Sequence, residues 1–133
     1  MNDRPNLFGS IDYRKWLSEV SGHLKATTRY FSHRWFAQAA GIGNPSYFSQ
    51  VVAGKRNLTP AMIERFAKAL ELSEKEALYF RHLVMFDQAA SALVKQEHYA
   101  VLREMAGSVR QTKLEPDAWD FADLGPELSR DFR

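Results

Sequence analysis

The basic pair Lys55 and Arg56, followed by Asn57, has a composition suited to binding phosphate. These residues come at the exit of a short segment with helical spacing, so a helix lying in a DNA groove would bring two cations and an amide close to phosphates. His33 and Arg34 stand in the first turn of an earlier helical segment, where backbone amides also favour an anion. The alternatives are that Arg34 is only a solvated residue and that Asn57 only caps the loop.

No other group of residues in the chain has the spacing of a reactive site. The chain contains no cysteine, which excludes disulfides and thiolate metal sites. The four histidines have no metal-ligand spacing with carboxylates, and each is expected at the surface. There is no serine elbow, glycine-rich phosphate loop or catalytic carboxylate pair. We therefore predict no metal, no cofactor and no enzymatic activity.

Two short helices must position the basic residues. Ser32 is a good N-cap for a helix that runs to Ala40, and Gly41 can take the left-handed conformation that ends it. Asn44 as N-cap and a proline at the first position predict a second helix over Pro45–Ala53. Two helices joined by such a tight turn form a helix-turn-helix.

Four further segments combine a helical start signal with apolar residues at helical spacing. They are expected to begin at Ser10 or Asp12, at Thr59, at Ser73 and at Ser91. The last is predicted to run to Met105, to bury Leu93 and Val94, and to stop at Gly107. The expected fold class is therefore all-α: a compact helix-turn-helix bundle of five to six helices with a short C-terminal tail.

The length and composition of the chain predict one domain. With 133 residues, of which 45% are apolar, it can bury one core and hardly two. We expect an N-terminal arm over residues 1–9, a helix-turn-helix helical domain over 10–107 and an acidic-aromatic tail over 108–133. The N-terminus lacks a basic region followed by an apolar one, and no apolar run reaches membrane-spanning length. A cytoplasmic protein is therefore expected.

Charge is distributed unevenly along the chain. Residues 1–70 hold ten Lys and Arg against four Asp and Glu, whereas residues 71–133 hold eight against twelve. A solvated surface without a partner could produce the same division. The basic half nevertheless coincides with the helix-turn-helix, and this coincidence favours a face that binds nucleic acid.

Several sequence segments resemble known regulators. GKRNLTPAMIERFAKALELS is similar to the glycine, basic loop, fourth helix and apolar stop of the phage-repressor (Cro/C1, XRE-type) helix-turn-helix proteins. More closely, IDYRKWL, FSHRWFAQAAG, PSYFSQVVAGKRNL and ALYFRHLVMFDQA resemble the frame of a bacterial family of regulators. The likeness covers residues 10–105 and implies a DNA-binding domain. Members of that family usually carry a second domain, which we do not expect here because only a short tail follows.

The resemblance also implies which side chains face the DNA groove. Counted back from Gly54, these are Ser46, Tyr47, Ser49 and Gln50. Gln50 could pair with adenine, and Tyr47 could donate to a base or a phosphate or pack on a thymine methyl. The helix contains no Arg or Lys, so A·T-containing sites or DNA shape are favoured over strong G·C readout. His33, Arg34, Lys55, Arg56 and Asn57 are then the expected phosphate contacts.

We therefore expect a sequence-selective double-stranded DNA-binding protein that acts as a transcriptional regulator. One short recognition helix reads too few base pairs for regulatory specificity, so a homodimer is expected. Its interface should use the apolar residues after Ser73, which exceed what a four-helix core can hide. These are Leu78, Tyr79, Leu83, Val84, Phe86, Leu93 and Val94.

The alternative function is that of a protein-interaction adaptor built on the helix-turn-helix scaffold, which docks through the helix over residues 45–53 or through the tail. Glu115 to Glu127 contain five acidic residues, no basic one and two prolines, so the tail cannot form a core alone. It is expected to fold back onto the last two helices through Trp119. Docking to a partner protein and plain disorder are the other possible fates of the tail.

Overall fold

Most helices in the described part of this protein begin at a capping side chain. The computed structural model describes residues 4–113, and these residues form helices and contain no strand. The elements are η1 (Leu7–Gly9), α1 (Tyr13–Thr27), α2 (His33–Ala40), α3 (Tyr47–Val52), α4 (Pro60–Ala69), α5 (Glu74–Gln88) and α6 (Ala92–Lys113). The all-α fold class and the number of helices are confirmed.

Five of the predicted caps are formed by side-chain hydrogen bonds, and one of them is Ser91, whose hydroxyl accepts from the amide of Val94 at the start of α6. Asp12 accepts from the first-turn amides of α1, Ser32 from the amide of Trp35, and Thr59 from that of Met62. At the start of α5, Ser73 and Glu76 form the expected capping box. Each such cap contributes about 1 kcal/mol of stability.

Two glycines end the helices of the helix-turn-helix. Gly41 has φ 72° and Gly54 has φ 82°, both in the left-handed region. After each, an amide reaches back five residues: Ile42 N–H donates to the carbonyl of Ala37 over 2.7 Å, and Lys55 N–H to that of Gln50 over 2.9 Å. The chain therefore leaves α2 and α3 in sharply defined directions.

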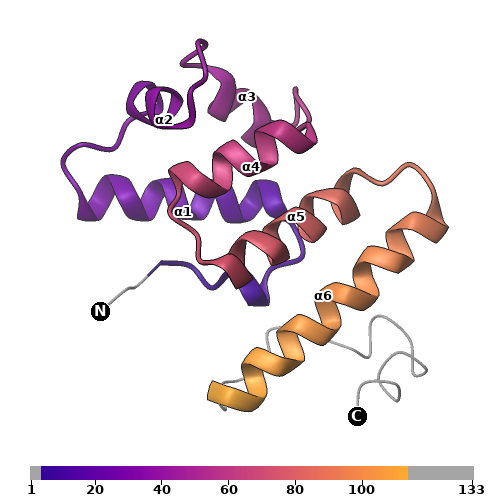
Figure 1. The fold of residues 1–133 in the computed structure, drawn as a ribbon. Coiled ribbons are helices and arrows are strands. Elements are labelled where there is room, and N and C mark those ends of the chain that lie inside the picture. Colours follow the sequence, from indigo (N-terminus) through magenta and orange to yellow (C-terminus); the bar gives the residue numbers. More distant parts are fainter. Residues whose placement is uncertain (1–3, 114–133) are drawn as a thin grey trace.

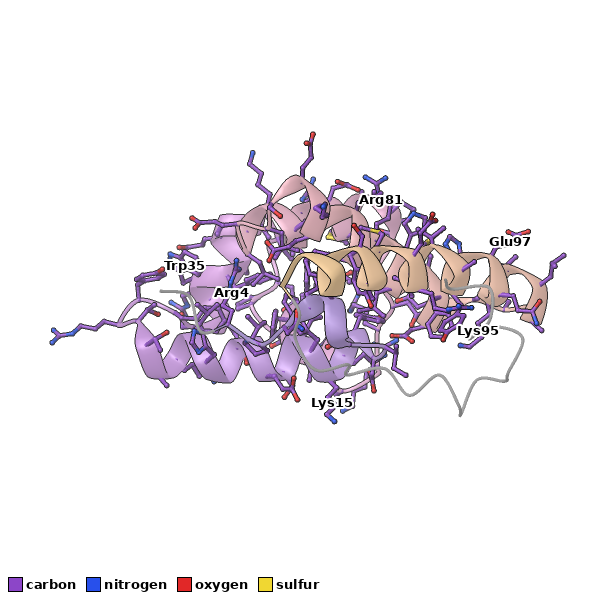
Figure 2. All side chains as sticks on the ribbon, turned by 90° about the horizontal axis from the view of Figure 1, so that it is seen from below. Arg4, Lys15, Trp35, Arg81, Lys95 and Glu97 are labelled. Carbon is purple, nitrogen blue, oxygen red and sulfur yellow. The ribbon has the colours of Figure 1, made fainter. Side chains whose placement is uncertain are left out.

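The helix-turn-helix lies at one end of the molecule and α6 at the other. In Figure 1, α2, α3 and α4 occupy the top of the view, α1 crosses below them, and α6 runs antiparallel to α5 at the bottom. Among the described elements, α6 packs against α5 and η1. Viewed from below, Lys95 and Glu97 on α6 lie at the opposite end of the molecule from Trp35 on α2 (Figure 2).

An aromatic cluster joins the helix-turn-helix to α4. The ring of Phe36 lies 4.8 Å from those of both Phe48 and Phe66, measured between centroids, and the Phe48 and Phe66 rings are stacked. All three side chains are buried. These aromatic residues therefore form a core and do not offer stacking platforms for bases.

The end of the last helix and the burial of its first turn differ from the prediction. Helix α6 continues through Gly107 to Lys113, because a glycine is tolerated within a helix at a cost of about 1 kcal/mol. Leu93 and Val94 are 66% and 40% exposed, so the prediction that they are buried is wrong. The buried residues of α6 recur at helical spacing and form one row that faces the core. Leu93 and Val94 do not lie in this row. The buried residues of the row are Tyr99, Leu102 and Ala106.

The apolar surface expected for self-association is smaller than predicted. Tyr79, Leu83 and Val84 are fully buried in the core, and Phe86 is half-buried. Helix α5 and η1 pack on each other and hide part of this surface. Among the side chains that the structure describes in α5 and α6, the large apolar ones that are exposed are Leu78, Met85, Leu93 and Val94.

The segment preceding α1 packs on the helical core. Leu7 is buried, the indole N–H of Trp16 donates to the carbonyl of Pro5 over 3.1 Å, and Arg4 donates to the carbonyl of Leu70 over 2.7 Å. Residues 4–9 therefore belong to the packed structure. The acidic-aromatic part of the predicted tail, including Trp119, lies outside the described residues.

Candidate nucleic-acid interface

Helix α3 has one buried side and one polar side. Phe48 and Val51 are buried, whereas Ser46 and Ser49 are exposed and Gln50 is half-buried. Three of the four residues predicted to face a DNA groove therefore lie on the accessible side of this helix. The helix begins at Tyr47 and not at Pro45, because the side chain of Asn44 binds the amide of Ser46 and closes a turn first.

Tyr47 does not lie on the polar side of α3. Its side chain is only 7% exposed, its ring centroid is 5.9 Å from that of Phe66, and its hydroxyl donates to the carbonyl of Asn57. Burial raises the pKa of this hydroxyl, and Arg56 acts in the opposite direction. The prediction that Tyr47 faces outward to contact a base is wrong, since the ring fills the space between α3 and α4.

Arg56 lies back against α3. Its Nε donates to Oε1 of Gln50 over 2.9 Å, and its guanidinium carbon lies 5.1 Å from the centre of the Tyr47 ring. The side chain is exposed. Among residues 4–113, no hydrogen bond is formed by its two terminal amino groups, so they are available to a partner.

Arg14 of α1 holds the loop that carries these cations. Its guanidinium donates to the carbonyl of Val51, to that of Arg56 over 3.0 Å and to Oδ1 of Asn57 over 2.7 Å. One side chain thus joins the last turn of α3 to the following loop. The amide oxygen of Asn57 accepts this hydrogen bond, so Asn57 has the structural role in the loop that was the alternative to phosphate binding.

Gln88, at the end of α5, holds the same loop from the other side. Its Oε1 accepts from the amide of Leu58 over 2.9 Å and its Nε2 donates to the carbonyl of that residue over 3.0 Å. Its Oε1 also accepts from the hydroxyl of Tyr13. Because Leu58 is buried, both of its backbone groups need partners inside the protein, and Gln88 supplies them.

Sequence analysis missed Arg14 and Gln88. A signal for Gln88 is present: it follows the buried residues Phe80 and Val84 at intervals of four, so a polar group stands at a core position of the helix. Such a group must find a buried partner. The sequence does not reveal that the partner is Leu58.

The other predicted phosphate contacts differ in their surroundings. Lys55 and Arg34 are exposed. His33 is half-buried with its ring 5.2 Å from that of Phe48, and burial followed by the nearby charge of Lys25 lowers the pKa of His33. The lowered pKa favours the neutral imidazole, which can offer an N–H group.

The segment around this surface contains no acidic residue. Between Glu19 and Glu64 the chain holds five Lys or Arg residues and no Asp or Glu. The segment spans most of α1, the whole of α2 and α3, and the basic loop. Its potential is therefore positive, and an anionic partner meets no carboxylate from this part of the chain.

The remaining histidines do not assemble a metal centre within the described part of the chain. His82 of α5 and His98 of α6 face each other with their Nδ1 atoms 3.0 Å apart, so that one nitrogen donates to the other. Burial, and then the neighbouring His98 and Arg81, lower the pKa of His82. No group of three or more potential ligands occurs among residues 4–113.

The fold and the surface together define an all-α helix-turn-helix bundle whose exposed cations lie on α2 and on the loop that follows α3. Searches of protein-family models, curated proteins and solved structures found no match to this chain. Within residues 4–113, every helix is too short or too polar to cross a membrane.

Proposed function

We propose that this protein is a sequence-selective double-stranded DNA-binding protein that acts as a transcriptional regulator. The observation that supports the proposal is the accessible side of α3, where Ser46, Ser49 and Gln50 stand next to the cations Lys55 and Arg56. Hydroxyl and amide groups complement base edges, whereas Lys and Arg neutralise phosphates. A helix of this kind enters the major groove in helix-turn-helix proteins.

In this proposal the cations act first, without regard to sequence. Lys55, Arg56 and Arg34 attract the phosphate backbone, and binding releases counterions from the DNA. His33 and Asn57 contribute N–H donors, because the lowered pKa of His33 favours its neutral form and the oxygen of Asn57 is bound to Arg14. The polar side of α3 then supplies the sequence preference.

A second copy of the chain completes the proposed DNA-binding unit. Helix α3 has six residues and spans too few base pairs for regulatory specificity by itself. Leu78 and Met85 lie seven residues apart on one side of α5, and Leu93 and Val94 are exposed at the start of α6. We propose that these four residues form the homodimer interface.

Salt-dependent binding of duplex DNA tests the proposal. Mobility shift with random genomic fragments at two salt concentrations should show weaker binding at the higher one. The double variant Lys55→Glu with Arg56→Glu should bind all fragments more weakly and lose about one to two phosphate equivalents from the salt slope.

The matched control is Lys75→Glu, which reverses an exposed cation in the first turn of α5, away from the basic loop. It should bind DNA as the wild type does. Equal binding by the double variant and the wild type would show that the loop does not face DNA. No binding by the wild type would favour the adaptor function instead.

A further inference from the structure

We propose that Arg56 and Gln50 form a single reading unit that selects guanine in the major groove. The inference rests on the proposed DNA-binding function and concerns the base that the site prefers. It assigns Arg56 to base recognition in addition to electrostatic attraction. It also replaces the expected pairing of Gln50 with adenine.

Contacts to the backbone and to the side chain of Arg56 together determine the position of its guanidinium. Its backbone carbonyl accepts from Arg14 over 3.0 Å, which holds the loop against α1. Its Nε donates to Oε1 of Gln50 over 2.9 Å, and the guanidinium lies over the Tyr47 ring. An arginine held in this way loses less rotamer freedom on binding than a freely solvated one. Buried Tyr47 thus has a place in the site as a support beneath Arg56.

Most of the hydrogen-bonding groups left on this unit are donors. With Nε engaged, Arg56 offers its two terminal amino groups, and Gln50 offers its Nε2 amide. Guanine presents two acceptors in the major groove, N7 and O6, and arginine binds them in a bidentate manner. Adenine presents one acceptor, N7, beside the donor N6–H, so it can accept from only one of the two Arg56 amino groups. The unit therefore matches guanine better than adenine.

The absence of Arg and Lys from the helix itself does not exclude guanine recognition. Arg56 lies four residues after the end of α3, and the left-handed turn at Gly54 redirects the chain before it. Its side chain then returns to the polar side of the helix, where Gln50 binds it. Lys55 carries no such contact among the described residues and keeps the role of a phosphate ligand.

Selection of binding sites from random-sequence duplexes tests the inference. Sites selected by the wild type should share a guanine at one position of each half-site. Arg56→Lys keeps the charge but loses the planar fork, so its affinity for the selected site should fall about tenfold or more. Its affinity for unrelated DNA and its salt slope should not change. Gln50→Ala releases Arg56 and should weaken the guanine preference without affecting unrelated DNA.

Two controls separate base recognition from other effects. Lys55→Arg exchanges the neighbouring cation and should leave the selected sequence unchanged. Replacing the shared guanine with 7-deazaguanine removes one acceptor from the DNA, so the wild type should lose affinity while Arg56→Lys should not. The loss of affinity by the wild type is measured without any change in the protein, so it does not depend on the folding of a variant.

The outcomes distinguish this inference from the proposed function. If the wild type binds DNA with a salt dependence but neither Arg56→Lys nor 7-deazaguanine alters affinity, Arg56 is only a phosphate ligand and the inference is wrong. Selected sites with a shared adenine that depends on Gln50 would overturn it equally. If the wild type does not bind duplex DNA at any salt concentration, the proposed function fails as well.

Discussion

Two glycines of this protein have opposite energetic roles at the scale of single residues. Gly54 has φ 82°, and a Cβ added there would meet no atom within 4 Å. Any cost of Gly54→Ala therefore comes from the left-handed backbone and amounts to about 1 kcal/mol. We expect a lower free energy of unfolding in urea, measured by circular dichroism, and a loosened turn at the end of α3.

Gly22 provides the control for this prediction. It lies within α1, and a Cβ added there also meets no atom within 4 Å. Alanine is the better helix former, so Gly22→Ala should raise the free energy of unfolding by about 0.5–1 kcal/mol. Changes of the same sign at Gly22 and Gly54 would contradict the conformation assigned to Gly54.

Asp87 couples the stability of the protein to pH. Burial raises the pKa of Asp87 to about 6, and the nearby charge of Asp12 acts in the same direction. The hydrogen bond from the Tyr13 amide and the charges of Lys95 and Arg14 lower this pKa but do not offset the burial. Between pH 4 and 6 the unfolded state therefore binds fewer protons at this group than the folded state. The contribution of Asp87 to stability must fall as pH rises through this interval.

Asp87→Asn should remove this dependence while it keeps an oxygen for the Tyr13 amide. Chemical denaturation at several values between pH 4 and 7 would give the difference in unfolding free energy between wild type and variant. We expect the stability of the wild type relative to the variant to fall as pH rises. A constant difference would show that Asp87 titrates normally.

At the scale of elements, Arg14 joins α1 to the end of α3 and to the basic loop. Its three hydrogen bonds are to two backbone carbonyls and one side-chain oxygen. Arg14→Met retains an apolar stem but leaves these acceptors without their charged donor, so we expect a loss on the order of 2 kcal/mol. Thermal and urea unfolding would measure it.

The same variant should affect DNA recognition, because Arg14 places the backbone of Arg56. We expect weaker discrimination between selected and unrelated duplexes, measured by fluorescence anisotropy. Lys15→Met, at the next and exposed position of α1, is the matched control and should change stability by no more than about 0.5 kcal/mol. Similar losses in both variants would mean that Arg14 does not position the loop.

At the scale of the whole molecule, the exposed apolar residues of α5 and α6 predict self-association. Sedimentation at micromolar concentrations should show a dimer for the wild type and a monomer for Leu93→Glu combined with Val94→Glu. Both side chains are exposed, so the variant should unfold with nearly unchanged free energy. The double variant should lose affinity for a duplex that contains two half-sites and should bind a duplex with a single half-site as the wild type does.

Ile11→Glu is the control for the dimer prediction. Ile11 is an apolar residue with 47% exposure that precedes α1 and lies outside the proposed interface. The Ile11→Glu variant should remain a dimer. A wild type that sediments as a monomer would contradict the dimer, although binding of single half-sites would then still be possible.

Local signals predicted the helices well because each depends on a few neighbouring residues. Ser32, Thr59 and Ser73 cap helices through bonds to amides three positions away, and Gly41 ends α2 through its own backbone freedom. The end of α6 could not be predicted in the same way. Gly107 ends a helix only if its backbone turns left-handed, and here it stays within the helix.

For the candidate site, the sequence by itself determined the polar and cationic composition of α3 and its loop and the exposure of Lys55 and Arg34. Only the tertiary structure decided that Tyr47 turns inward, that Arg56 returns to Gln50, and which side chains hold the loop. Arg14 and Gln88 reach backbone groups 30 or more residues away in the chain. No local pattern encodes such a contact, because it depends on how α1, α3 and α5 pack around a shared core.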